Sequence, residues 1–170
     1  MTELAILIGL QASGKSTFYR SHLAATHALV SKDLLRNNRR PGRRQARLVA
    51  ETLAAGRSVA VDNTNATAEL RRELIGLGRS HGAVITGYYV GARLEDCLAR
   101  NAARTGKDRV PDVGLFAVVK VLTRPSYAEG FDRLYYVTLG VNGGFVVEPW
   151  QDQPTPTAEG NSTGGQGHDG

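Results

Sequence analysis

A glycine-rich run from Gly9 to Thr17 has the residue types and spacing of a phosphate-binding loop. Its sequence, GLQASGKST, fits the pattern G-x-x-x-x-G-K-[ST] and directly follows the apolar stretch Leu4–Ile8. In such a loop, backbone N–H groups surround nucleotide phosphates, and the N-terminus of the next helix adds a partial positive charge. We therefore expect a nucleoside triphosphate to bind here, in contact with Gly9, Gln11, Ala12, Ser13, Gly14, Lys15, Ser16 and Thr17.

Two side chains of this loop have expected chemical roles of their own. Lys15 would reach the β- and γ-phosphates, and the hydroxyl of Ser16 would hold Mg²⁺. The alternative interpretation is a Gly/Ser turn that caps an ordinary helix. That alternative leaves both Lys15 and Ser16 unexplained.

Two carboxylates follow two further apolar stretches. Asp33 comes after residues 28–31, and Asp62 is followed by Asn63, Thr64 and Asn65. Ligands of open α/β sheets bind beyond the carboxyl ends of the strands, so both carboxylates should face the phosphate loop. One would accept a proton from an attacking hydroxyl, and the other would orient Mg²⁺ or its waters. The alternatives are a helix cap for Asp33 and a simple polar turn at 62–65.

Positive charge is expected opposite the loop, on a lid. Arg100 and Arg104 lie one helical turn apart, and the Gly-containing segment 105–111 follows them. Such a segment would close over the phosphates, and an arginine on it would stabilise transition-state charge. A solvated helix face explains the same spacing equally well.

Six arginines stand in the twelve residues 36–47. A stretch of this kind contacts nucleic-acid phosphates in many proteins. The alternative is a solvated basic loop. Aromatic residues are not interleaved with the arginines, so base stacking has no support here.

Alternating apolar runs and helical patterns predict the fold that positions these residues. We expect strands at 4–8, 28–31, 58–62, 84–90 and 134–139, and helices that begin at or near residues 15, 33, 45, 68, 94 and 115. This order predicts a three-layer α/β fold, with a parallel sheet, helices on both faces and a small helical lid. An Asn-Gly turn should pair 134–139 with 145–147 as a hairpin. In the helix from Ala68, which Thr67 would cap, Leu70, Leu74 and Leu77 should face the sheet.

The composition is that of one soluble domain. The chain has 170 residues, is 41% hydrophobic and carries a formal net charge of +5. We expect the domain at 1–150 and a disordered tail, poor in apolar residues, at 151–170. Cys97 is the single cysteine, and no signal peptide or membrane span is apparent, so a cytoplasmic location is expected.

Several motifs together resemble one family, the 5′-hydroxyl polynucleotide kinases with the phage-type kinase domain and their bacterial relatives. Their order and spacing cover roughly residues 3–138. The matching elements are GLQASGKST, SKDLLR at 31–36, VDNTN at 61–65, RNAARTGKDRVP at 100–111 and PSYAEGFDRLYYV at 125–137. Ala12, where many relatives have Gly, and Lys32, where Arg or Asn is frequent, depart from the family pattern.

The resemblance implies a P-loop NTPase fold and a role for each matching residue. It implies ATP and Mg²⁺ as cofactors and a 5′-hydroxyl of DNA or RNA as acceptor. Lys15, Asp33 and Arg104 would be catalytic, with Asp33 as the general base; the substrate would be bound through Arg36, Asp62, Asn65 and Arg100.

Other acceptors and partners also follow from the resemblance. A phosphatase or ligase activity would lie on a separate partner chain, and no membrane partner is expected. The alternatives are a small-molecule or nucleoside kinase, and a nucleotide-dependent RNA-binding ATPase.

Overall fold

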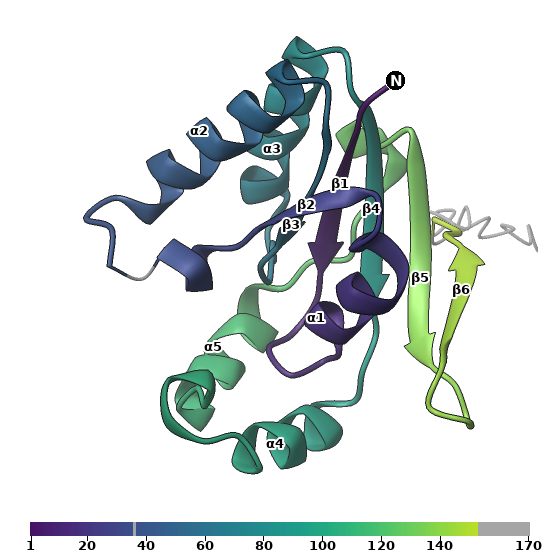
Figure 1. The fold of residues 1–170 in the computed structure, drawn as a ribbon. Helices are drawn as coiled ribbons and strands as arrows, with labels where there is room; N and C mark the ends of the chain where they lie inside the picture. Colours follow the sequence, from purple (N-terminus) through teal and green to yellow (C-terminus); the bar gives the residue numbers. More distant parts are fainter. Residues whose placement is uncertain (36, 153–170) are drawn as a thin grey trace, which may run out of the picture.

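The computed structural model describes residues 1–35 and 37–152. They form a six-stranded sheet with the order β2-β3-β1-β4-β5-β6 (Figure 1). The strands are β1 (Glu3–Ile8), β2 (His27–Val30), β3 (Ser58–Asp62), β4 (Val84–Val90), β5 (Arg133–Leu139) and β6 (Phe145–Pro149). The expected strands are confirmed: β3 and β4 have the expected ends, and the ends of the others differ by one or two residues.

The sheet is parallel except at one edge. Strands β2, β3, β1, β4 and β5 pair in parallel, and only β6 runs antiparallel, against β5. Leu139 pairs with Phe145 across the predicted hairpin turn, in which Gly143 has the left-handed φ of 77°. Strands β2 and β3 lie on one side of β1, and after β3 the chain crosses over to form β4 on the other side. This reversal at β1 marks the edge where open α/β sheets bind ligands.

Helices connect the strands at nearly the expected places. They are α1 (Lys15–Phe18), α2 (Pro41–Ala54), α3 (Ala68–Ser80), α4 (Leu94–Ala102) and α5 (Asp112–Val121). A π-helical turn, Tyr19–Leu23, continues α1. Helix α2 begins at Pro41 rather than at residue 45, because proline fits the first helical position, where its missing N–H has no partner to lose. The helix expected near residue 33 is a short 3₁₀ turn, Lys32–Leu35.

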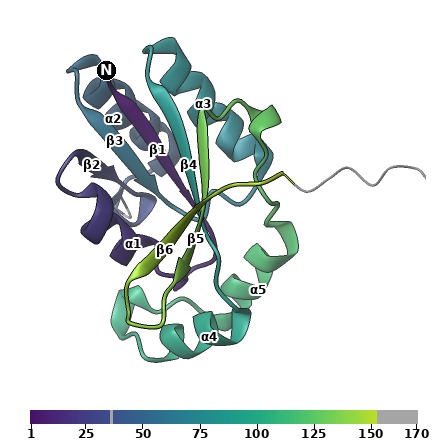
Figure 2. The same ribbon diagram turned by 90° about the vertical axis from the view of Figure 1, so that its right-hand side faces the viewer.

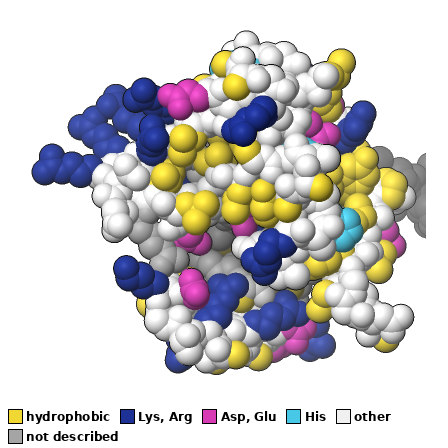
Figure 3. Space-filling view, viewed as in Figure 1, with side chains coloured by type: hydrophobic (Ala, Val, Ile, Leu, Met, Phe, Trp, Pro, Cys, Tyr) yellow, Lys and Arg dark blue, Asp and Glu magenta, His cyan; other side chains and the backbone are white. Residues whose placement is uncertain are grey.

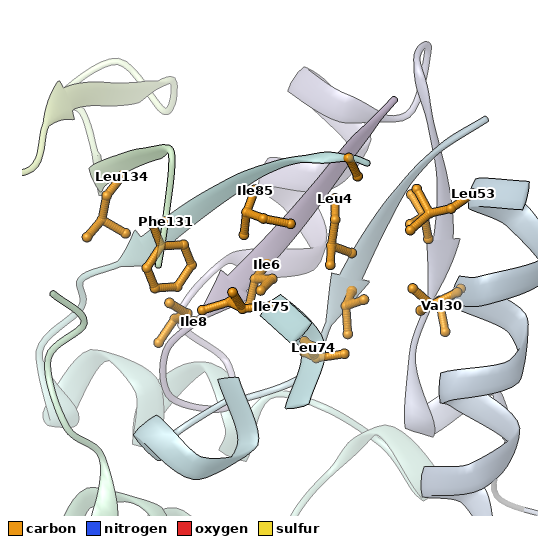
Figure 4. Close-up of a cluster of buried hydrophobic side chains, with 14 of the residues drawn as sticks. Leu4, Ile6, Ile8, Val30, Leu53, Leu74, Ile75, Ile85, Phe131 and Leu134 are labelled. Atoms are coloured by element: carbon orange, nitrogen blue, oxygen red, sulfur yellow. The ribbon is translucent and has the colours of Figure 1, made fainter. Parts of the chain in front are cut away.

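Helices cover both faces of the sheet, as predicted. On one face, Val49 and Leu53 of α2 and Leu74 and Ile75 of α3 pack against alternate residues of the strands (Figure 4). On the other face, Phe18, Tyr19 and Leu23 pack against Ala5, Leu7 and Ala60. Strand β1 is therefore buried on both sides, which explains its continuous apolar run.

Helix α3 packs on the core through two of the three leucines that the apolar pattern predicts, Leu74 and Leu77, but not through Leu70. Leu74 is buried, but Leu70 is 41% exposed, and Arg71 is completely buried. The helix begins as expected, because the side chain of Thr67 accepts a hydrogen bond from the N–H of Leu70 at 3.2 Å. The burial of a charged residue in place of Leu70 has its cause in the site described below.

A third, smaller cluster lies at the lower end of the molecule, beyond the arrowheads of the parallel strands. There α4 and α5 pack next to the phosphate loop (Figures 1 and 2). Leu10, Ala12, Cys97 and Leu115 are its buried members. No helix among the described residues is long and apolar enough to cross a membrane. Most of the predicted tail, 153–170, lies outside the described residues, as does Arg36.

Candidate active site

The loop between β1 and α1 has the backbone shape that close contact with phosphates requires. Gly9 has φ +151° and Gly14 has φ +108°, and a Cβ on Gly9 would meet the carbonyl oxygen of Val90 at 2.7 Å. A side chain at Gly9 would therefore push the loop away from β4. Gly14 also accepts the hydrogen bond from Phe18 N–H that begins α1.

Ala12 takes a backbone conformation that favours glycine. Its φ is 61°, in the left-handed region, where a Cβ costs roughly 1–2 kcal/mol. Its carbonyl oxygen accepts a hydrogen bond from Nη1 of Arg100 at 3.0 Å. The structure thus places Arg100, expected at the substrate, on the backbone of the phosphate loop, where it bonds the residue that departs from Gly.

Lys15 is held inside its own loop. Its Nζ donates to the carbonyl oxygens of Gly9 at 2.9 Å and Leu10 at 2.6 Å, and the residue is 7% exposed. Burial lowers the pKa of Lys15 to about 8, against the opposing attraction of Asp62. A negatively charged phosphate in the loop would restore the charged form.

Ser16 and Asp62 form a pair at the mouth of the loop. Ser16 Oγ donates to Oδ2 of Asp62 at 2.6 Å. The pairing follows from the sheet register, because Leu7 in β1 stands next to Asp62 at the end of β3. These two oxygens suit Mg²⁺, which is commonly bound through one or two protein oxygens, several waters and substrate phosphates. No group of three or more His, Cys, Asp or Glu among the described residues could hold a metal alone.

The loop also presents buried polar atoms that fit a nucleotide. Among the described residues, Oε1 of Gln11 and Oγ of Ser13 are buried without a hydrogen-bond partner. Buried polar groups without partners are costly, and a bound polar ligand relieves that cost. The loop opens into a cleft of about 560 Å³. Its lining includes Lys15, Ser16, Thr17, Asp33, Asp62 and Arg104.

Asp33 therefore lies in the same cleft as the phosphate loop. It stands in the first turn of the 3₁₀ segment Lys32–Leu35. Ser31 already caps this turn, since its Oγ accepts from Asp33 N–H at 3.2 Å and its carbonyl from Leu34 N–H at 3.1 Å. Capping therefore does not require the Asp33 carboxylate, and this weakens the alternative interpretation of Asp33.

The turn after β3 is held from within. Asn65 has φ 45°, is 5% exposed, and its Nδ2 donates to the carbonyl oxygen of Leu7 at 2.7 Å. Thr64 accepts at its carbonyl from Gly9 N–H at 3.0 Å. The structure thus places Asn65, expected to bind substrate, behind the cleft, where it fastens the turn to β1 and to the phosphate loop.

Arg71 supports the same turn, and the residue pattern of the helix did not predict this. Its Nη1 donates to the carbonyl oxygens of Asn65 at 3.0 Å and Thr123 at 3.1 Å. Its Nε and Nη2 bond both carboxylate oxygens of Glu129, at 2.7 and 3.2 Å. This buried ion pair ties the turn at 62–65 to the segment before β5. The only signal in the sequence was the position of Arg71 next to the VDNTN element.

The lid region places one of its two arginines in the cleft. Arg104 lines the cleft, and its Nη1 donates to the carbonyl oxygen of Asp108 at 3.4 Å. Asn101 shapes the segment that follows, because its Oδ1 accepts from Val110 N–H at 2.9 Å. The structure thus separates Arg104, which faces the cleft, from Arg100, which faces the loop backbone.

A second hollow contains most of the arginine run. It has a volume of about 470 Å³ and is lined by Asn38, Arg39, Arg40, Arg43, Arg44 and Arg47. Figure 3 shows Lys and Arg side chains gathered at the upper left, over α2 and the loop before it. We call this surface the arginine groove. It adjoins the segment that carries Asp33, because α2 contacts that segment.

The parallel sheet, the loop behind β1 and the Ser16–Asp62 pair define a P-loop NTPase. The family comparison agrees, because a model described as an AAA domain matches residues 4–124, more than half of the chain. The chain therefore belongs to this AAA-domain family, and the family implies ATP as the nucleotide.

Two curated relatives match the chain over most of its length. Transcription factor bHLH140 of Arabidopsis thaliana is 30% identical over 144 residues, which are 78% of this chain and 16% of that protein. The bifunctional polynucleotide phosphatase/kinase of Schizosaccharomyces pombe is 25% identical over 136 residues, 78% of this chain and 32% of that protein. The chain thus spans less than a third of the length of either relative.

Solved structures share the fold at low identity. Kti12 of Chaetomium thermophilum, in complex with ADP-AlF3, has a TM-score of 0.66 and 17% identity, covering 79% of this chain and 88% of its own. A gluconokinase of Sinorhizobium meliloti has a TM-score of 0.58 and 19% identity, covering 80% and 82%. The Pnkp1/Rnl/Hen1 complex contains a chain with a TM-score of 0.53 and 22% identity, covering 58% and 38%. By family the chain is an AAA-domain protein, and by fold it is a P-loop NTPase.

Proposed function

We propose that this chain is an ATP- and Mg²⁺-dependent polynucleotide kinase that transfers the γ-phosphate to a 5′-hydroxyl of DNA or RNA. The observation that carries the proposal is the cleft in which Asp33 and Arg104 share one lining with Lys15 and the Ser16–Asp62 pair. Phosphoryl transfer needs a positioned acceptor, a group that takes its proton and cations that spread the charge. This cleft contains residues for each of these tasks.

In the proposed reaction, the acceptor oxygen forms a bond to the γ-phosphorus while the bond from that phosphorus to the β–γ bridging oxygen breaks. The hydroxyl proton passes to the carboxylate of Asp33, and ADP leaves with the bridging oxygen. Lys15 stabilises the charge on the β- and γ-phosphates, and Arg104 stabilises the transferring group from the lid. Mg²⁺, held by Ser16 and by waters that Asp62 orients, would neutralise phosphate charge.

Asp62, Asn65 and Arg100 have supporting roles in this proposal. Asp62 organises the metal site through Ser16, while Asn65 and Arg100 fix the backbone around the phosphates. Substrate binding was expected of all three. Substrate binding by these residues stays a prediction, and their contacts also support a role in shaping the cleft.

The arginine groove supports a polynucleotide as the acceptor. A nucleoside or an unphosphorylated sugar carries no phosphate, so a basic groove outside the cleft contributes little to binding it. A polynucleotide whose 5′ end lies at Asp33 carries a phosphate for every further nucleotide, and arginines bind such phosphates. Arg36, next to the groove in sequence, remains the proposed contact for the first acceptor phosphate. The fission-yeast relative is named for the same activity.

Partner and location complete the proposal. A phosphatase or ligase partner on a separate chain is proposed, and one structure of the same fold comes from a complex named Pnkp1/Rnl/Hen1. A cytoplasmic location is proposed from the single cysteine, Cys97, which is typical of reducing compartments.

The deciding experiment is label transfer from γ-labelled ATP. Three acceptors are compared: 5′-hydroxyl oligonucleotides of DNA and RNA, a panel of nucleosides and sugars, and water alone. Transfer to oligonucleotides with preference over nucleosides supports the proposal. Transfer to small molecules alone identifies a small-molecule kinase, and release of phosphate without any acceptor identifies an ATPase.

A further inference from the structure

Two amide side chains connect Asp33's segment to helix α2, outside the residues assigned so far. Oδ1 of Asn63 accepts from the backbone N–H of Lys32 at 2.9 Å. Nδ2 of the same Asn63 donates to Oε1 of Gln45 at 2.6 Å. Gln45 is only 7% exposed, on the face of α2 turned away from solvent.

We call the hydrogen bonds from Lys32 N–H to Asn63 and from Asn63 to Gln45 the amide relay. The first of these bonds fixes which amide atoms donate and which accept. The N–H of Lys32 can only donate, so Asn63 must present its oxygen there and its NH₂ to Gln45. Gln45 must then present its oxygen to Asn63. The relay therefore requires an acceptor at position 45 and an amide at position 63.

The relay holds the chain at the point where the pairing of β2 with β3 ends. Strands β2 and β3 pair as far as Val30 and Val61, and the chain from Ser31 onward leaves the ladder. Beyond that point, Ser31 Oγ accepts from Asp33 N–H locally, and Asn63 bonds the backbone of the 3₁₀ segment from the side of β3. Because Asp33 is the next residue after Lys32, the place of its carboxylate in the cleft depends on this bond.

We infer that Gln45 and Asn63 are positioning residues, which hold Asp33 at the phosphate loop and link it to the helix that carries the arginine groove. The inference rests on the proposed function, because it assigns these amides to the orientation of the proposed base. Gln45 stands between Arg44 and Arg47 in sequence, but on the buried face of the helix. A phosphate acceptor substrate that binds the groove arginines thus contacts the same helix that positions Asp33 through Gln45.

The central test compares Gln45→Ala with Gln45→Glu. Loss of the acceptor in Gln45→Ala should lower kcat for the acceptor reaction about 10- to 100-fold, because small misplacements of a reacting group are costly, while the KM for ATP stays near its wild-type value. A carboxylate at position 45 still accepts from Asn63, so Gln45→Glu should recover most of the lost kcat. Gln45→Met fills a similar volume without an acceptor and should lose kcat as Gln45→Ala does, whereas a role in packing alone would leave its kcat near the wild-type value.

Thr52→Ala is the matched control. Thr52 is buried on the same helix, and its Oγ1 donates within that helix, to the carbonyl oxygen of Leu48 at 2.7 Å. This variant loses a buried polar group without touching the relay and should keep the wild-type kcat. Adding Gln45→Ala to Asn63→Ala should lower kcat little further, because both variants break one chain of bonds.

Amide hydrogen exchange gives a readout that does not require activity. Exchange at the N–H of Lys32 should accelerate in Gln45→Ala and Asn63→Ala, and not in Thr52→Ala. An unchanged kcat in Gln45→Ala, no recovery in Gln45→Glu, or an equal loss in Thr52→Ala overturns the inference. A wild-type protein that phosphorylates no acceptor overturns the proposed function instead, and the Lys32 exchange rates then decide the relay by themselves.

Discussion

The two sides of the cleft are built in different ways. On the nucleotide side, Lys15, Asp62 and Asn65 are each less than a tenth exposed, and each is bonded to the loop or to β1. On the acceptor side, Asp33 and the groove arginines are exposed, and their segment is held to the sheet by amide side chains. The nucleotide side is thus shaped by hydrogen bonds between buried groups. The acceptor side instead presents exposed charged side chains. Changes on the first side should act mainly through geometry, whereas changes at the groove arginines should alter binding in a way that depends on ionic strength.

Lys15→Ala should have the largest effect. Its ammonium group has no substitute in the loop, and loss of one positioned donor to the transferring group costs about 10²–10³ in rate, or more where the charge is also lost. Phosphoryl transfer should therefore fall below detection, while thermal unfolding shows a folded protein. Lys15→Met, which keeps the buried stem, separates the lost charge from the lost packing. Wild-type turnover in either variant would mean that this loop is not the active site.

Asp33→Asn should come next, and it tests the acceptor side by itself. Removal of a positioned base should lower kcat roughly 10²–10⁴-fold with little change in ATP affinity. Asp62→Asn is the comparison on the nucleotide side, where the main effect should be a higher Mg²⁺ requirement. Mild and equal effects in the two variants would mean that both carboxylates serve only the local backbone.

Salt dependence should separate the two sides more finely. Each phosphate contact of a single strand contributes a slope of about −0.7 to log affinity against log salt, so acceptor KM should rise steeply between about 50 and 200 mM salt. The variant with Gln at positions 39, 40, 43 and 44 should flatten this dependence. ATP binding should change much less with salt in both proteins. Normal oligonucleotide phosphorylation by the variant at every salt concentration would make the groove a solvated surface.

The smallest expected effect is the pH dependence of ATP binding. The pKa of Lys15 is lowered to about 8 in the protein without ligand, and bound phosphates raise it again. Between these two pKa values ATP binding takes up a proton, so affinity should fall up to about tenfold per pH unit above pH 8 and change little from this group below about pH 7. Calorimetry at about pH 9 in buffers of different ionisation enthalpy measures the uptake. The prediction fails if wild type takes up no proton, or if Lys15→Met takes up as many.

Much of the frame of the cleft could be predicted from local patterns. The apolar runs gave each parallel strand within one or two residues, and the phosphate loop follows from its glycines and Lys15. These signals are local, because side-chain periodicity and turn chemistry act over a few residues. The cap at Thr67 is of the same kind.

The contacts that complete the site could not be predicted in this way. Arg71 looks like a solvent-exposed residue of an amphipathic helix until Glu129, 58 residues later, is placed next to it. Gln45 and Asn63 meet only because α2 packs on β3. Asn65 and Arg100 carry polar groups that a motif assigns to substrate, yet their partners are backbone carbonyls of distant segments. Such partners depend on tertiary packing, which a single sequence shows only through a family resemblance.

The buried guanidinium of Arg71 has a consequence for the order in which the chain matures during synthesis. The phosphate loop and the turn that Arg71 supports emerge early, whereas its carboxylate partner Glu129 follows the family-matched span that ends at residue 124. A completely buried guanidinium without its carboxylate partner costs several kcal/mol even when carbonyl oxygens accept from it, so a chain that lacks Glu129 disfavours this arrangement of the turn at 62–65. We therefore expect a nascent chain to carry its phosphate loop for some time before the turn that supports this loop is stable. The support of this turn is complete only after the segment before β5, which contains Glu129, has been synthesised.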